Sequence, residues 1–110
     1  NKVFKVSKKF KKKNNILAFV LDLTEEKNVE YLINQTIKKF KKIDILVNSA
    51  GVSGPGNIEN TTVSSWEYIH KNNGTSTFLC CKHAIPHMKK KKYGKVVNIS
   101  SIAGRFRCKT

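Results

Sequence analysis

The segment at residues 43–51, with the sequence I-D-I-L-V-N-S-A-G, constrains the fold more than any other part of the chain. Its first five residues are mostly apolar and β-branched, and four small or polar residues stop the run abruptly. A short apolar run of this kind is typical of a buried strand in a parallel sheet. In open α/β sheets, ligands bind beyond the carboxyl ends of the strands. We therefore expect an α/β fold with a ligand site where this strand, at residues 43–47, gives way to a glycine-rich loop.

Two further apolar runs of strand length lie at residues 16–21 and 96–100. Between the first two strands, apolar residues recur at i, i+3, i+4, i+8 and i+11 from Val29, which predicts an amphipathic helix. We expect Thr24 to cap this helix, and lysines crowd its far end, where cations complement the helix dipole. The alternation of strands and helices predicts a parallel sheet with right-handed crossovers.

The remaining helices are expected between the second and third strands. One surrounds Trp66, with Thr61 or Thr62 as its N-cap. Another begins at about Asn73 and continues until Pro86 disturbs it. The basic stretch at residues 2–13 is interpreted as the tail of a further helix.

The net charge of +15, from 22 Lys and Arg against 7 Asp and Glu, raises the question of a polyanionic partner. The lysines fall in short homopolymeric runs at helix ends and connections, and asparagine is also frequent. This pattern indicates a compositional bias that fills solvent-facing positions, and no nucleic-acid-binding module is recognisable. We therefore expect no nucleic-acid partner, and a steep loss of affinity with added salt would be the sign of one.

Three cysteines, Cys80, Cys81 and Cys108, give an odd count without a C-x-x-C pair. This favours a reducing compartment over a disulfide scaffold, and we expect a cytoplasmic location. No apolar run approaches the length needed to span a bilayer, so no membrane partner is expected.

Two patterns of candidate ligand-binding residues are rejected as sites. Gly51, Gly54 and Gly56 follow a strand, but they do not open directly into a helix as a phosphate-binding fingerprint requires. Cys80, His83 and His87 fall on one helix face, yet no fourth ligand lies nearby and Pro86 interrupts the spacing. We therefore expect no metal site.

Four segments, in register, resemble motifs of one enzyme family. They are V-L-D-L-T around Asp22, N-S-A-G at residues 48–51, the helical stretch from Trp66 through Asn73 and Phe78 to Met88, and G-K-V-V-N-I-S-S-I-A-G at residues 94–104. In these positions the short-chain dehydrogenase/reductase family has a strand-end Asp, N-N-A-G, W…N…G-x-F…P-x-M and G-x-I-V-N-I-S-S-x-A-G. The chain is identified as a member of that family through nearly its whole length.

The resemblance implies the middle portion of a Rossmann-like, doubly wound parallel sheet: the third, fourth and fifth strands with their helices. Residues 1–110 would form a partial nucleotide-binding domain. The family's glycine-rich motif is expected upstream of Asn1, and its Y-x-x-x-K beyond Thr110. In the family order the third and fourth strands are not neighbours, so a gap of about 14 Å would separate them here.

The resemblance also implies hydride transfer between NAD or NADP and a small alcohol or ketone. Ser101 would hydrogen-bond the substrate oxygen, and the main-chain carbonyl of Asn73 would hold a water of the proton relay. The residues expected to bind the cofactor are Asp22, Leu23, Asn48, Ala50 and Gly51. The segment alone is expected to be inactive, and the parent protein is expected to form homodimers or homotetramers through the helix at residues 73–88.

Two departures from the family pattern leave an alternative open. Gly74 stands where a large apolar residue is usual, with Ser76 in place of the glycine that usually follows, and Lys41 replaces a glycine that often ends the first helix. Lys41 would place a side chain where a left-handed backbone is common. These departures favour, against the oxidoreductase, a non-catalytic family member that serves as a binding protein. A basic nucleic-acid-binding module is the third hypothesis.

Overall fold

A computed structural model describes residues 15–54 and 57–102 of the chain. The helix tail expected at residues 2–13 lies outside the described residues, as does the end of the last motif at Ala103 and Gly104. The elements, in chain order, are helix α2 (Glu26–Phe40), strand β1 (Ile45–Asn48), helix α3 (Val63–His70), π-helix η2 (Lys71–Thr75), helix α4 (Ser76–Lys90) and strand β2 (Lys95–Asn98).

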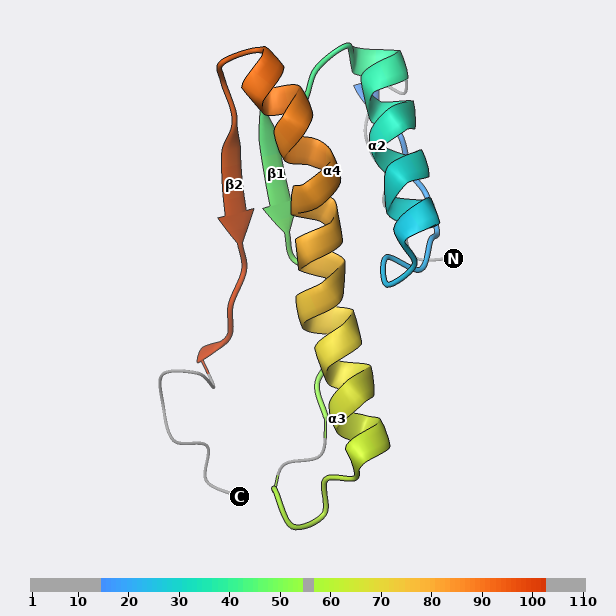
Figure 1. Ribbon diagram of the computed structural model, residues 1–110, viewed down its shortest axis with the longest axis vertical. Coiled ribbons are helices and arrows are strands. Elements are labelled where there is room, and N and C mark those ends of the chain that lie inside the picture. The colour runs from blue at the N-terminus through green and yellow to red at the C-terminus, as the bar shows by residue number, and fades with distance from the viewer. Residues whose placement is uncertain (1–14, 55–56, 103–110) are drawn as a thin grey trace.

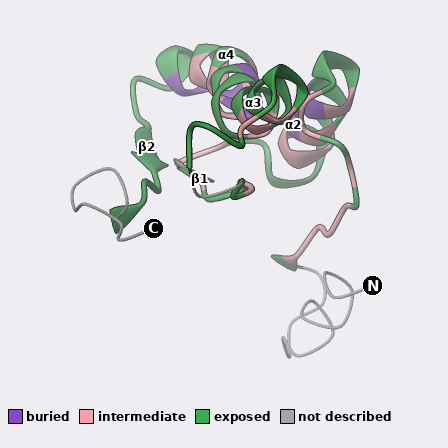
Figure 2. Ribbon diagram, turned by 90° about the horizontal axis from the view of Figure 1, so that it is seen from below, coloured by how far each residue is buried: buried purple, intermediate pink, exposed green. Residues whose placement is uncertain are grey.

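The two strands lie side by side and parallel, with Ile45 opposite Lys95 and Asn48 opposite Asn98. This pairing confirms the expected parallel arrangement. Helices α3 and α4 follow one another through η2 as a continuous rod, which returns the chain to the amino end of β2 (Figure 1). All the described helices lie on the same side of the strand pair (Figure 2). Because the two strands are parallel, their carboxyl ends lie at the same edge of the sheet.

The prediction of a strand at residues 16–21 is wrong, because the structure has no strand there. A strand requires a neighbour to share its backbone hydrogen bonds, and the described residues provide none beside this segment. The segment is held to α2 by side chains instead. The Phe19 ring meets the Tyr31 ring edge-on, 5.7 Å between centroids, and Lys39 Nζ donates to the Ile16 carbonyl oxygen at 3.1 Å.

The helix ends agree with the sequence analysis in part. Thr62 caps α3, and its hydroxyl accepts from the Ser65 N–H at 3.1 Å. The prediction that Thr24 caps α2 is wrong. Glu25 occupies the N-cap position of this helix and makes no capping hydrogen bond with its side chain. The Thr24 hydroxyl and N–H both donate to Asp22 Oδ1, at 2.7 and 2.9 Å, and the helix begins two residues later at Glu26. Lys41 ends α2 with φ 67°, the left-handed conformation that glycine favours.

The helix at α4 does not end near Pro86, so that part of the prediction is wrong. It continues to Lys90 with Pro86 inside it. Proline removes one hydrogen bond from a helix interior. Tertiary contacts on both sides offset the loss, because Ala84 and Met88 are buried one turn apart along the same face.

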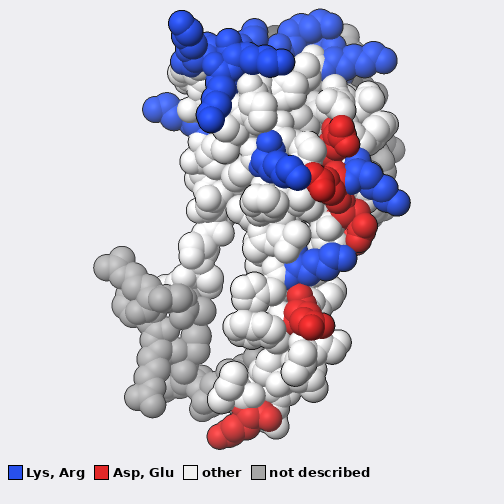
Figure 3. All heavy atoms as spheres, viewed as in Figure 1, with Lys and Arg blue, Asp and Glu red and all other residues white. Residues whose placement is uncertain are grey.

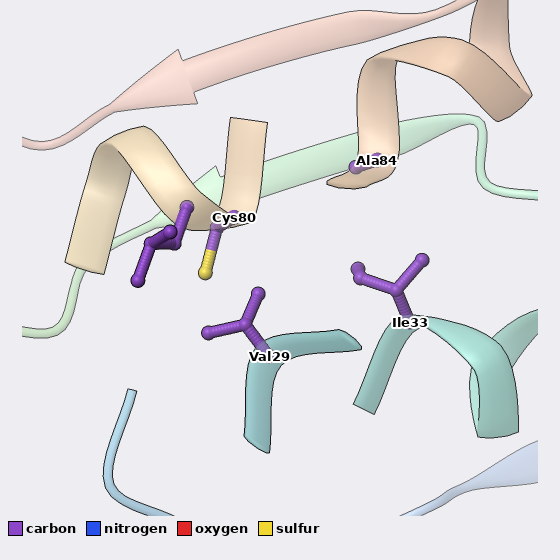
Figure 4. Close-up of a cluster of buried hydrophobic side chains, with 5 residues drawn as sticks. Val29, Ile33, Cys80 and Ala84 are labelled. Carbon is purple, nitrogen blue, oxygen red and sulfur yellow. The ribbon is translucent and has the colours of Figure 1, made fainter. Parts of the chain in front are cut away.

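A small apolar core joins α2 to α4. Val29 and Ile33 of α2 pack against Leu79, Cys80 and Ala84 of α4 (Figure 4). Burial raises the pKa of the Cys80 thiol, and the neighbouring Cys81 raises it further. Cys80 therefore stays protonated and packs as a small apolar side chain.

Charged side chains link the same two helices at their exposed edge. Glu26 Oε1 lies 2.7 Å from Lys82 Nζ and 2.9 Å from His83 Nε2. These hydrogen bonds, from Lys82 first and then His83, hold the pKa of Glu26 below its ordinary value. A lowered pKa means that this link stabilises the fold above the ordinary pKa of 4.5 and is lost as the pH falls through the lower, folded value.

Neither a membrane span nor a metal cluster is found in residues 15–54 and 57–102. No helix there has the length and apolar character needed to cross a bilayer. No three histidine, cysteine, aspartate or glutamate side chains are grouped to hold a metal ion there. Cys80 and His83, from the rejected ligand trio, contribute to the core and to the Glu26 link.

Replacing Lys41 with glycine is expected to stabilise the end of α2, because glycine adopts φ 67° without steric strain from a Cβ atom. A gain of about 0.5–1 kcal/mol would slow amide exchange in the last turn of α2 about two- to fivefold. Hydrogen-exchange mass spectrometry measures this change. The matched control is Lys38→Gly inside the helix, which should accelerate exchange. Faster exchange in Lys41→Gly would contradict the prediction.

The 110-residue chain alone is expected to unfold without a single sharp transition. Its sheet has two strands, and Ile45 and Val47 of β1 are 60% and 56% exposed. A two-stranded sheet with exposed apolar residues gains little from cooperative burial. Scanning calorimetry should show a broad, weak heat absorption. A sharp peak whose calorimetric and van't Hoff enthalpies agree would refute this expectation.

Candidate functional site

The carboxyl ends of β1 and β2 are tied together by two asparagines. Asn48 Nδ2 donates to Asn98 Oδ1 at 2.8 Å and lies 3.4 Å from Cys81 Sγ on α4. This bond joins the ends of the two neighbouring strands. The acceptor, Asn98, is a site residue that was not predicted from the sequence. Its signal is that both strands end on asparagine.

The loop after β1 is held to the helical rod by Asn73. Its side-chain Oδ1 accepts from the Val52 N–H at 2.8 Å, and its Nδ2 donates to the Val52 carbonyl oxygen at 2.9 Å. The amide thus pairs with the backbone as a neighbouring strand would. A Cβ atom at Gly51 would lie 3.1 Å from Asn73 Oδ1, so glycine permits this close approach.

Asn73 lies in the π-helical segment η2, where the Ser76 N–H bonds to the Lys71 carbonyl oxygen five residues earlier. The Thr77 hydroxyl donates to the main-chain oxygen of Asn73 at 2.9 Å. Single π-helical turns inside α-helices occur frequently at functional sites. The sequence predicts a regular helix from this residue and carries no pattern that indicates the wider turn.

Two cavities adjoin at the loop after β1. The first, of about 520 Å³, is lined by Asp22 and Leu23. The second, of about 470 Å³, is lined by Asn48, Asn73 and Ser101. Both cavities are also lined by three loop residues, Ala50, Gly51 and Val52. All seven residues expected at the site therefore line one or both of two adjoining hollows at the carboxyl edge of the strands.

The first cavity has a fixed carboxylate on its wall. Asp22 Oδ1 accepts from the Thr24 hydroxyl at 2.7 Å and from the Thr24 N–H at 2.9 Å. These bonds, the hydroxyl's first, lower the pKa of Asp22, and the Lys71 cation lowers it further. Asp22 is therefore ionised at neutral pH and can accept hydrogen bonds from a ligand.

Several lining residues were missed from the sequence. Lys71 lines the first cavity, and its Nζ lies 3.1 Å from Glu25 Oε1. Tyr68 and Asn72 line the same cavity, and Thr77 lines the second. The sequence feature that could have identified these residues is their position within about one helical turn of Asn73. Which face of the rod meets the loop could not be derived without the π-helical turn.

Comparison with known proteins gives a consistent result. A family model described as "short chain dehydrogenase" matches residues 1–110. The chain is 35% identical over 100 residues to the 3-oxoacyl-[acyl-carrier-protein] reductase FabG of Buchnera aphidicola subsp. Schizaphis graminum. The aligned residues cover 91% of this chain and 41% of the relative.

Solved structures resemble the fold as well. The chain matches ElxO with NADP bound with a TM-score of 0.80 and 38% identity, over 87% of this chain and 39% of that one. It matches the NADH-dependent reductase A1-R′, responsible for alginate metabolism, with a TM-score of 0.71 and 30% identity, over 83% and 39%. These matches confirm the expected fold class, the middle portion of a Rossmann-like α/β sheet. The chain spans about two fifths of the length of each of these three proteins.

Replacing Asn73 with alanine is expected to release the loop after β1, because it removes both hydrogen bonds to Val52. At about 0.5–1.5 kcal/mol each, their loss should accelerate exchange of the Val52 amide by about tenfold or more. Asn72→Ala is the control, because its amide bonds to Tyr68 within the rod. Equal acceleration in both variants, measured by hydrogen-exchange NMR, would show that Asn73 does not hold the loop.

Proposed function

The chain belongs to the short-chain dehydrogenase/reductase family, and from this premise we propose that it forms the central part of an NAD(P)-dependent oxidoreductase. The reaction transfers a hydride between the nicotinamide cofactor and an alcohol or carbonyl substrate. One observation carries the proposal: the cavities that hold Asp22 and Ser101 share the wall formed by Ala50, Gly51 and Val52. A molecule as long as a dinucleotide needs two hollows that lie side by side along one stretch of backbone, as these two do.

The residues of this wall fit a nucleotide. Gly51 has no side chain and Ala50 a small one, so a flat ligand can approach the backbone closely. We assign Asp22 and Leu23 to the adenine end, because the Asp22 carboxylate is ionised and faces the first cavity. Asn48 supports the opposite end through its bond to Asn98. The bound cofactor would supply or accept the hydride.

Ser101 and Asn73 act on the substrate side in this proposal. The Ser101 hydroxyl would hydrogen-bond the substrate oxygen and stabilise the charge that develops there, as an oxyanion donor does. The main-chain carbonyl of Asn73 would hold a water of the proton relay. Its place in a π-helical turn beside the second cavity supports this role.

Both NAD and NADP remain consistent with this site, since similar structures are named for NADP and for NADH. The substrate class is a small alcohol or ketone. We further propose a homodimer or homotetramer that pairs through α4, where Phe78 is 60% exposed. The described thiols, Cys80 and Cys81, are free, which supports a cytoplasmic location. The 110-residue chain by itself would be inactive.

The test uses an oxidoreductase in which this segment is part of a complete domain. Ser101→Ala should lower kcat by about 10²–10³, because one donor to the developing charge is lost. Ser100→Ala, at the preceding position along the second cavity, is the matched control and should change kcat little. Reduction of NAD and of NADP is followed by absorbance over a panel of alcohols. Equal losses in the two variants would remove Ser101 from the reaction.

A further inference from the structure

The lysines of the described part gather at one end of the molecule. Helices α2 and α4 finish there and both strands begin there (Figure 1). Figure 3 shows them as a cap on that end. This lysine pole contains nine of the twelve described lysines: Lys38, Lys39, Lys41, Lys42, Lys89, Lys90, Lys91, Lys92 and Lys95.

The carboxylates are distributed in the opposite way. Of the seven carboxylates, all within the described part, one lies at the pole, where Asp44 Oδ2 is 2.7 Å from Lys42 Nζ. The remainder of the described part holds six carboxylates and three lysines, and two of those lysines, Lys71 and Lys82, are paired with glutamates. A compositional bias alone would scatter lysines over all solvent-facing positions. This segregation requires a different explanation.

Helix dipoles account for a small part of this charge. The carbonyl ends of α2 and α4 each carry about half a negative charge, which lysines in the last turns complement. The pole has a formal charge of +8, from nine lysines and Asp44. The two helix ends together supply about one negative charge, so most of the charge of +8 is not neutralised by the helix dipoles. All nine lysines are exposed, so the charge faces solvent.

The surroundings of the lysines indicate the kind of anion. The described residues contain no arginine, the side chain suited to bidentate recognition of phosphates and bases. Tyr93, between Lys92 and Lys95, is 54% exposed, and Phe40, beside Lys39 and Lys41, is 36% exposed. Basic side chains with interspersed aromatic ones suit the headgroup region of a bilayer. The lysines cap an end of the molecule, whereas binders of single-stranded nucleic acid line a groove.

We propose that the lysine pole docks this protein end-on to an anionic phospholipid surface. Lysines supply the attraction to lipid phosphates, and Tyr93 and Phe40 enter the interface. This adsorption needs no spanning helix. Because the pole lies at the amino ends of β1 and β2, the cavities at their carboxyl ends face the aqueous side. The proposal is independent of the catalytic assignment.

Vesicle co-sedimentation tests the proposal on an oxidoreductase in which this chain is part of a complete domain. This protein should bind vesicles of phosphatidylserine and phosphatidylcholine, and not vesicles of phosphatidylcholine alone. Replacing Lys38, Lys89, Lys90 and Lys91 with glutamine should weaken binding at least about tenfold, because lysines near an anionic surface each add attraction. Glutamine preserves helix propensity. The control replaces Lys8, Lys9, Lys11 and Lys12, with the same loss of net charge, and should weaken binding less.

Two further arms keep the test decisive. Hydrogen exchange of the unsubstituted protein on vesicles should protect residues 38–42 and 89–95 and leave residues 57–70 unchanged, which requires no variant to fold. Equal weakening by both sets of substitutions would overturn the proposal, because net charge alone would then explain binding. Tighter binding to duplex DNA than to vesicles at equal phosphate concentration would also overturn it, in favour of a nucleic-acid partner.

Discussion

The packing of α2 against α4 is the contact on which the rest of the described structure depends. Val29 and Ala84 are fully buried at this contact, and Glu26 links the same helices at the exposed edge. The strands pair with each other, but their outer face has no helix among the described residues. α4 therefore positions the sheet, and the segment η2 that leads into it holds the loop after β1 through Asn73. A change that loosens the α2–α4 contact is transmitted to the site through α4.

The site itself is built from side-chain amides that replace missing backbone partners. Asn48 and Asn98 join the strand ends, and Asn73 pairs with both polar groups of Val52. An amide can donate and accept at once, so one side chain satisfies two groups of a loop that lies outside the sheet. This chemistry fixes the loop firmly and leaves Gly51 and Ala50 bare toward the cavities.

Local patterns in the sequence predicted what local interactions determine. The apolar stripe from Val29 predicted α2, and the hydroxyl of Thr62 predicted the cap of α3. The lysine in place of a helix-ending glycine predicted a side chain in a left-handed conformation at Lys41. Features that depend on distant neighbours were not predictable in the same way. The run at residues 16–21 has the composition of a strand, yet it has no partner in the described part. Thr24 has the side chain of a helix cap, but it turns back to bond Asp22 and the helix begins later, at Glu26.

The shared wall at Ala50, Gly51 and Val52 has a thermodynamic consequence. Because the same backbone bounds both cavities, a ligand that displaces this wall on entering one of them alters the affinity of the other. Such linkage is reciprocal, so each occupant changes the binding of its neighbour by the same factor. Asn73 sets the stiffness of that wall and, with it, the strength of communication between the two ends of a long ligand.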